Sequence, residues 1–103
     1  MADRRRPVRW TDEARSALDE AISYIVQDSP QGARTVLDQA LEAAAGLATL
    51  FERGRVVPEI DHPSIREVFV GRYRLMYQVR ASEVVILTFL HGARDFAKWR
   101  KEN

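Results

Sequence analysis

The stretch Arg66–Val79, "REVFVGRYRLMYQV", predicts two strands joined by a tight turn. Gly71 and Arg72 lie at its centre, and a glycine in the first of two turn positions is typical of a type II′ hairpin. This turn pairs Val70 with Tyr73, and the pairs on either side follow from it. Side chains in a strand alternate between faces, so the register assigns each residue to a face. One face carries Val68, Val70, Tyr73, Leu75, Tyr77 and Val79, and the other carries Glu67, Phe69, Arg74, Met76 and Gln78.

A third strand follows the hairpin. Val84–Leu90, "VVILTFL", is apolar on both faces, which is typical of a central or covered strand. If residues 81–82 form the turn, Arg74 lies beside Phe89, and His91 lies on the same face as Arg74. A three-residue turn would reverse that assignment. An apolar strand is compatible with either register, so both alternatives stay open.

The first half of the chain predicts a short strand and a helix hairpin. Val8 and Trp10 alternate with polar residues, as in a strand. Thr11 and Ser29 each precede a run of apolar residues at helical spacing, and both residue types cap helix N-termini. Only "DSPQ" separates the two runs, so the helices form a hairpin. Residues 52–64 contain two prolines and a glycine and predict a loop.

The predicted fold is therefore α+β, as a single domain over residues 1–103. An N-terminal strand and a helix hairpin precede an antiparallel three-strand meander, and a short C-terminal helix or tail follows. The helix hairpin covers one face of the sheet. The other face is expected to be open, with Arg74 pointing into it from a rigid strand.

Composition narrows the classes of function. The 103 residues are 46% hydrophobic and 30% charged, as in ordinary globular proteins. The chain has no cysteine and only two histidines, far apart in sequence, so we expect no disulfide, metal site or cofactor. Neither a membrane-spanning run nor a signal-peptide pattern is present, which predicts a cytoplasmic protein without a membrane partner.

Charge is distributed unevenly along the chain. Residues 11–51 carry seven acidic and two basic side chains, a net charge of −5, within a chain whose net charge is +1. The rest of the chain is therefore basic, and it includes the Arg66–Val79 hairpin. This asymmetry is compatible with an anionic partner for the basic part, and equally with solvated faces of different sign.

Four segments together resemble the RelE/ParE toxins of type II toxin–antitoxin systems. They are "VRWTDEARSALDEAISYIVQDSP", "GRVVPE", "REVFVGRYRLMYQV" and "ILTFLHGARD", in the order and spacing of that family. "YRLMY" and "HGARD" look closer to the ParE side. The resemblance implies a cognate antitoxin that wraps the toxin in a hetero-oligomer. Such an antitoxin is usually small and acidic, with an N-terminal DNA-binding region.

The resemblance implies two possible activities. Members like RelE cleave mRNA on the ribosome, and that alternative assigns catalysis to Glu59 as base, Arg74 as phosphate clamp and His91 as acid. Members like ParE poison DNA gyrase by binding. Gly92 after the histidine and the presence of only two lysines favour the second activity. We therefore expect a gyrase inhibitor rather than an enzyme, with the ribosome-dependent endoribonuclease and a non-toxic binding domain as alternatives.

The residues expected to contact the target or the antitoxin combine basic and large apolar side chains. Some have a purely structural alternative: Arg74 can pair with Glu67 across the hairpin, and Phe96 and Trp99 can pack on the chain's own core. The expected contact residues are Arg66, Phe69, Arg72, Arg74, Met76, Arg94, Phe96, Trp99, Arg100 and Lys101.

Overall fold

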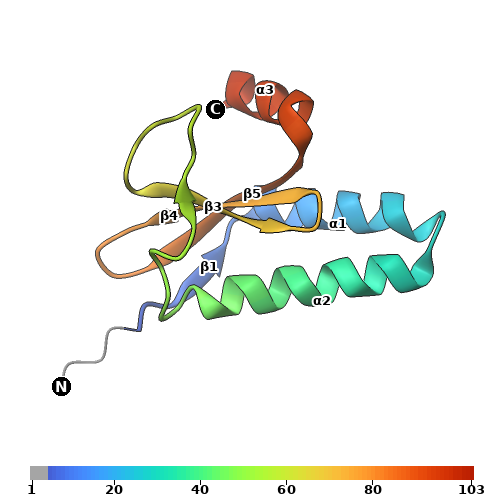
Figure 1. Cartoon of the computed structure of the whole chain (residues 1–103), viewed down its shortest axis with the longest axis horizontal. Helices are drawn as coiled ribbons and strands as arrows, with labels where there is room; N and C mark the ends of the chain where they lie inside the picture. The colour runs from blue at the N-terminus through green and yellow to red at the C-terminus, as the bar shows by residue number, and fades with distance from the viewer. Residues whose placement is uncertain (1–4) are drawn as a thin grey trace.

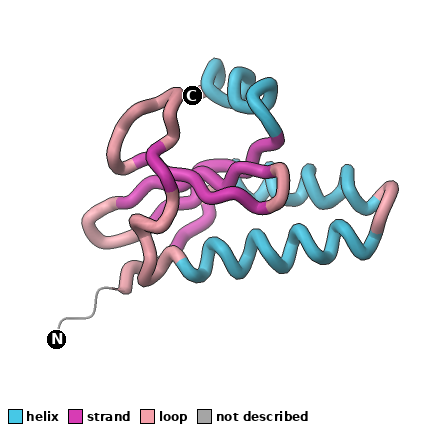
Figure 2. Tube along the Cα trace, viewed as in Figure 1, coloured by secondary structure: helices cyan, strands magenta, loops and turns pink. Residues whose placement is uncertain are grey.

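The structure, a computed structural model, describes residues 5–103, apart from the side chains of Ala93 and Arg94. A five-stranded sheet has the strand order β1-β5-β4-β3-β2, in which β1 is parallel to β5 and the other pairs are antiparallel (Figures 1 and 2). The predicted α+β class and element order are confirmed. Within residues 5–103, no helix has both the length and the apolar character needed to cross a membrane. The elements are β1 (Val8–Trp10), α1 (Asp12–Val26), α2 (Pro30–Gly46), β2 (Arg55–Val56), β3 (Ile65–Val70), β4 (Tyr73–Val79), β5 (Val84–His91) and α3 (Gly92–Glu102).

The β3–β4 hairpin has the register that its sequence predicts. Gly71 has a φ of 58°, a left-handed conformation that glycine adopts readily at the first position of a type II′ turn. Val70 pairs with Tyr73, and Phe69 pairs with Arg74. Every side chain of the hairpin therefore lies on its predicted face.

Polar caps fix both helix starts, as predicted. The Thr11 hydroxyl accepts a hydrogen bond from the Ala14 amide at 3.0 Å and donates one to the Ile86 carbonyl at 3.1 Å. The Ser29 hydroxyl accepts from the Gly32 amide at 2.9 Å. Thr11 thus begins α1 and also fastens that start to β5.

One stretch predicted as loop contains an edge strand. Arg55 and Val56 of β2 pair with Glu67 and Arg66 of β3, within the range 52–64. Two residues are too few to produce a recognisable alternation, which is why the sequence pattern did not indicate this strand.

A β-bulge corrects the predicted register of β5. The Arg80 amide donates to the Glu83 carbonyl at 2.9 Å, so the turn is the two-residue alternative. The ladder then shifts between Met76 and Tyr77, and beyond this shift Arg74 pairs with Leu90 rather than with Phe89. The expectation that Arg74 lies beside Phe89 is wrong, because the bulge inserts one extra residue into β5.

The bulge also decides which face carries the end of β5. Leu75 now pairs with Phe89, and Tyr73 pairs with His91. Phe89 and His91 therefore lie on the face of Tyr73 and Leu75, opposite to Arg74.

The α1–α2 hairpin covers that face of the sheet and forms the larger core. Most of the buried helix residues are alanines, which let the helices approach the sheet closely. Leu47, Leu75, Tyr77 and Ile86 are fully buried here. This core is thin on the helix side, and large side chains of the sheet fill it.

The second face of the sheet is covered, which corrects the expected open face. α3 and the β2–β3 loop lie over it (Figure 1), and they bury a smaller apolar cluster of Val57, Met76, Leu90 and Phe96. Met76 has no exposed surface, so its predicted role as an exposed contact is wrong. Burial of Met76 and Leu90 against Phe96 removes apolar surface from water, which is why the C-terminal segment packs here as a helix.

We predict opposite effects of alanine at two glycines. A Cβ on Gly54 would lie 2.5 Å from the Glu67 carbonyl oxygen, whereas a Cβ on Gly46 would meet only an arginine side-chain atom at 3.6 Å. Gly54→Ala should lower the free energy of unfolding by about 1 to 3 kcal/mol through overpacking. Gly46→Ala should leave it unchanged or raise it by up to about 1 kcal/mol, because alanine favours helix. Urea denaturation measures both, and equal stability of the two variants would contradict the close approach at Gly54.

Candidate functional site

The Arg74 side chain on β4 is buried and hydrogen-bonded within the fold, rather than exposed to a partner. Its Nε donates to Glu67 Oε1 at 2.6 Å, and its Nη1 and Nη2 donate to the two carboxylate oxygens of Glu59 at 2.9 and 2.8 Å. Its guanidinium carbon lies 5.0 Å from the ring centroid of Phe96. Only 7% of the residue is exposed. Arg74 therefore joins β3, the β2–β3 loop and α3.

A second arginine completes the network. The Glu67 side chain is fully buried, and its Oε2 accepts from Arg55 Nε at 2.6 Å. The Arg55 guanidinium in turn lies 5.0 Å from the ring centroid of Phe69. Two carboxylates thus face two guanidinium groups, so the network as a whole carries no net charge. A phosphate arriving here would have to displace a carboxylate before it could pair with Arg74.

The network holds Glu59 in its ionised form. The hydrogen bonds from Arg74 lower the pKa of the Glu59 carboxyl, and they raise the pKa of the Arg74 guanidinium. A general base needs a pKa near the operating pH in order to take up a proton efficiently. Glu59 is therefore a carboxylate suited to binding a cation and poorly suited to proton transfer.

His91 lies apart from this network. It ends β5 on the opposite face of the sheet, with its ring centroid 5.0 Å from that of Tyr73. Its backbone amide donates to Asp95 Oδ2 at 3.2 Å, which ties the end of β5 to the first turn of α3. Of the three residues predicted for a nuclease site, the structure brings Glu59 and Arg74 together and places His91 elsewhere.

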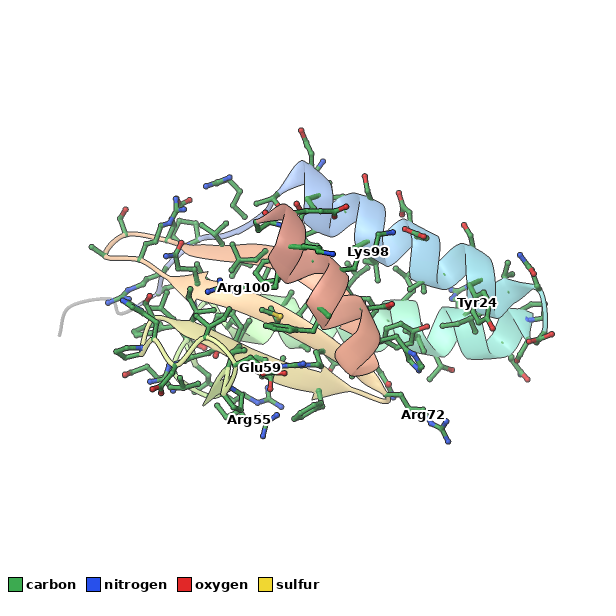
Figure 3. All side chains as sticks on the ribbon, turned by 90° about the horizontal axis from the view of Figure 1, so that it is seen from above. Tyr24, Arg55, Glu59, Arg72, Lys98 and Arg100 are labelled. Atoms are coloured by element: carbon green, nitrogen blue, oxygen red, sulfur yellow. The ribbon has the colours of Figure 1, made fainter. Side chains whose placement is uncertain are left out.

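The residues predicted for partner contacts divide by exposure. Arg72 on the hairpin turn and Arg100 on α3 are exposed and lie at different places on the surface (Figure 3). Phe69 is 57% exposed, although it is a large apolar side chain. The Arg94 side chain lies outside the described residues. Phe69, Arg72, Arg100 and Lys101 are exposed, Arg66 and Trp99 are partly buried, and Arg74, Met76 and Phe96 are buried.

The two partly buried residues, Arg66 and Trp99, are hydrogen-bonded to other parts of the chain. Arg66 Nη1 donates to the Gly54 carbonyl at 2.9 Å, and its Nε donates to the Pro63 carbonyl at 3.1 Å. Trp99 Nε1 donates to Glu13 Oε2 at 2.6 Å and so links α3 to α1. Because these donors are already bonded within the fold, Arg66 and Trp99 offer few free hydrogen-bond donors to a partner.

The sequence did not indicate that Arg55 and Glu13 take part in these contacts. Arg55 precedes two valines, and that short apolar pair was the only local signal that it could align with β3. The contact between Glu13 and Trp99 spans 86 positions and has no local signal. Among the described residues, no group of three or more histidine, aspartate or glutamate side chains is arranged to bind a metal ion.

Comparisons with known proteins point to one family. The family model described as "ParE toxin of type II toxin-antitoxin system, parDE" matches residues 8–96. Solved structures with a similar fold include the chromosomal ParDE TA system from P. aeruginosa, with 21% identity, a TM-score of 0.69 and coverage of 86% of this chain and 98% of that chain. The toxin–antitoxin complex RelBE2 from Mycobacterium tuberculosis is 24% identical, with a TM-score of 0.55 and coverage of 86% and 93%. No curated protein matches the sequence.

We predict that the bond between Glu59 and Arg74 makes stability depend on pH in the acid range. The pKa of Glu59 is lower in the folded chain than its ordinary value of 4.5, so this bond stabilises the fold above pH 4.5. The stabilisation is lost as the pH falls through the folded-state pKa. Glu59→Gln should therefore be less stable than the wild type at neutral pH, and the difference should shrink below pH 4.5.

Thermal unfolding from pH 7 down to pH 3 measures that difference. Glu42→Gln is the matched control, because Glu42 is an exposed residue of α2 outside the network. A gap between wild type and Glu59→Gln that stays constant with pH would contradict the ionic character of the bond.

Proposed function

The chain belongs to the ParE toxins of type II toxin–antitoxin systems, and on that basis we propose that it arrests growth by binding DNA gyrase. A cognate antitoxin neutralises it in a toxin–antitoxin complex, and the toxin acts in the cytoplasm, where gyrase works. The observation that carries the proposal is the arrangement of Glu59, Arg74 and His91, which favours binding over catalysis.

Ribonuclease action would need a base, a free cation and an acid around one phosphate. Arg74 already donates to two carboxylates, and Glu59 is one of them. His91 lies on the other face of the sheet, beside Tyr73. Proton transfer by this set would require Glu59 to leave Arg74 and His91 to change face. A binding function requires neither change, which supports inhibition by contact.

We place the contact surface at the exposed members of the predicted set. Phe69 projects from β3 with Arg55 over its ring, and Arg72 lies on the adjacent turn. A large exposed apolar ring beside a guanidinium group is typical of binding hot spots. Arg100 and Lys101 on the last turn of α3 add positive charge. An acidic antitoxin segment that folds on binding would cover Phe69 and neutralise the neighbouring arginines.

Arg74 is not suited to testing this surface. Removal of its side chain would leave the buried Oε1 of Glu67 without its charged partner, while Arg55 bonds only Oε2, and breaking a buried ion pair destabilises a fold strongly. Loss of toxicity in such a variant would report loss of folding.

We predict that the purified toxin inhibits DNA supercoiling by gyrase and traps cleaved gyrase–DNA complexes. Ribosome-bound mRNA should remain intact, because Glu59 and His91 are not placed for proton transfer. A supercoiling assay and a ribosome-programmed cleavage assay measure the two activities on the same preparation. Ribosome-dependent cuts that disappear in His91→Ala would instead establish the endoribonuclease.

A second prediction tests the contact surface. The double variant Phe69→Ala, Arg72→Ala should inhibit gyrase at least tenfold less potently, because hot-spot side chains each contribute about 1 kcal/mol or more. The control is Leu41→Ala, Arg34→Ala, which also removes one exposed apolar residue and one arginine, but from α2. Both variants should keep the wild-type circular dichroism spectrum. Equal loss of potency in the two would remove Phe69 and Arg72 from the contact surface.

A further inference from the structure

Arginines from four distant segments of the chain lie together at one end of the molecule. Arg6 Nη1 donates to the Arg80 carbonyl at 2.9 Å, and the Arg6 guanidinium carbon lies 3.9 Å from the ring centroid of Phe51. Arg66 Nη1 lies 3.4 Å from the carbonyl oxygen of Glu52, the residue after Phe51. We call this group the arginine end, and its members are Arg6, Arg9, Arg53, Arg66 and Arg80.

The arginine end keeps most of its positive charge. In the part of the chain that the structure describes, Glu83 is the one carboxylate paired with these arginines, and Arg9 and Arg80 share it at 3.1 and 3.3 Å. Arg6 and Arg66 donate instead to backbone carbonyls, which carry no net charge. Five arginines and the two glutamates of these segments give the arginine end a net charge of +3.

The acidic helix hairpin extends away from the arginine end. Figure 1 shows the β4–β5 turn, which follows Arg80, at one end of the long axis, and the α1–α2 turn with Asp28 at the other. The molecule is 47 Å long, whereas salt screens a charge over about 10 Å. Acidic side chains near the α1–α2 turn therefore do not cancel the positive potential at the arginine end.

The side chains around these arginines narrow the kind of anionic partner. Phe51 and Tyr77 are buried there, and the mostly exposed aromatic rings of the described chain, Tyr24 and Phe69, lie toward the α1–α2 and β3–β4 turns. Proteins that bind single-stranded nucleic acid stack its bases on exposed aromatic rings. Leu50 is exposed beside Phe51, but one leucine is a small apolar area for a lipid or peptide surface. Guanidinium groups without such rings suit the phosphates of a duplex.

We propose that the arginine end binds the phosphate backbone of double-stranded DNA without reading its sequence. Arg6, Arg9 and Arg80 contact phosphate oxygens through the N–H groups that they do not use within the fold. Arg53 and Arg66 add positive charge beside them. Such contacts release the counterions that surround DNA, so the affinity falls steeply as the salt concentration rises.

The arginine end is separate from the surface proposed for gyrase. Phe69 and Arg72 lie at or beside the β3–β4 turn, and Figure 3 shows Arg72 on the same side of the view as Tyr24 of the helix hairpin. The choice of DNA over an RNA duplex rests on the proposed function, because gyrase acts on DNA. DNA binding is measured without gyrase, so failure of either proposal is recognised independently of the other.

The test is a titration of a fluorescently labelled DNA duplex of about 20 base pairs with the purified toxin, followed by fluorescence anisotropy. The association constant should fall about 40-fold between about 50 and 200 mM salt, as expected for contacts with about three phosphates. Two duplexes of unrelated sequence should bind equally. Single-stranded DNA, an RNA duplex and phosphatidylglycerol vesicles serve as competitors, and tighter binding of any of them than of duplex DNA would overturn the proposal.

Matched variants separate the arginine end from a general effect of net charge. Arg53→Gln with Arg80→Gln should weaken duplex binding at least tenfold at about 100 mM salt and lower the salt slope by about two. Arg34→Gln with Arg72→Gln makes the same change in net charge away from the arginine end, and it should change affinity less than about twofold.

A third variant should strengthen binding. Glu83→Gln removes the carboxylate that Arg9 and Arg80 share and keeps every arginine, so its affinity for the duplex should rise. All variants should keep the wild-type circular dichroism spectrum. Equal effects of the two double variants, or weaker binding by Glu83→Gln, would overturn the proposal.

Discussion

The ion pair between Arg74 and Glu67 is the interaction on which the second half of the molecule depends. Glu67 is wholly buried, and a carboxylate is taken out of water only at a large free-energy cost unless it is paired and hydrogen-bonded. Arg74 and Arg55 together satisfy both of its oxygens. Because Arg74 also holds Glu59 and lies against Phe96, the pairing required by one buried acid fixes the β2–β3 loop and α3 on the sheet.

This network reduces the number of arginines in the basic half of the chain that remain available to a partner. Its excess of arginine suggested an anionic partner, but several of these arginines are already engaged within the fold. Arg55 and Arg74 pair with Glu67, and Arg9 and Arg80 pair with Glu83. Charge counted along a sequence therefore overestimates the charge that a surface presents, because pairing between distant residues is invisible in the count.

The sequence predicts those features whose cause is local. Gly71 determines a two-residue turn, and the turn determines every pair in the β3–β4 hairpin. Thr11 and Ser29 cap helices with their own side chains. The bulge in β5 has no such signal, since an all-apolar strand packs well in either register. The one extra residue in β5 places His91 and Arg74 on opposite faces of the sheet. Without it both side chains would lie on one face, as a nuclease site requires, and the sequence does not exclude that arrangement. Likewise, the cover that α3 provides for Met76 depends on contacts between distant segments.

The double role of Thr11 has a consequence for how the toxin is made. Its hydroxyl begins α1 and also binds the Ile86 carbonyl, while β1 pairs in parallel with β5. The first and last strands of the sheet are thus neighbours in space, although both helices of the α1–α2 hairpin and three strands lie between them in the chain. Folding that depends on such distant contacts is slow and waits for the later segment. A ribosome-bound chain lacks the partner of β1 until β5 has been synthesised and has left the ribosome. We therefore expect the sheet to form only after that point, so that an antitoxin already present can meet the chain while it is still folding.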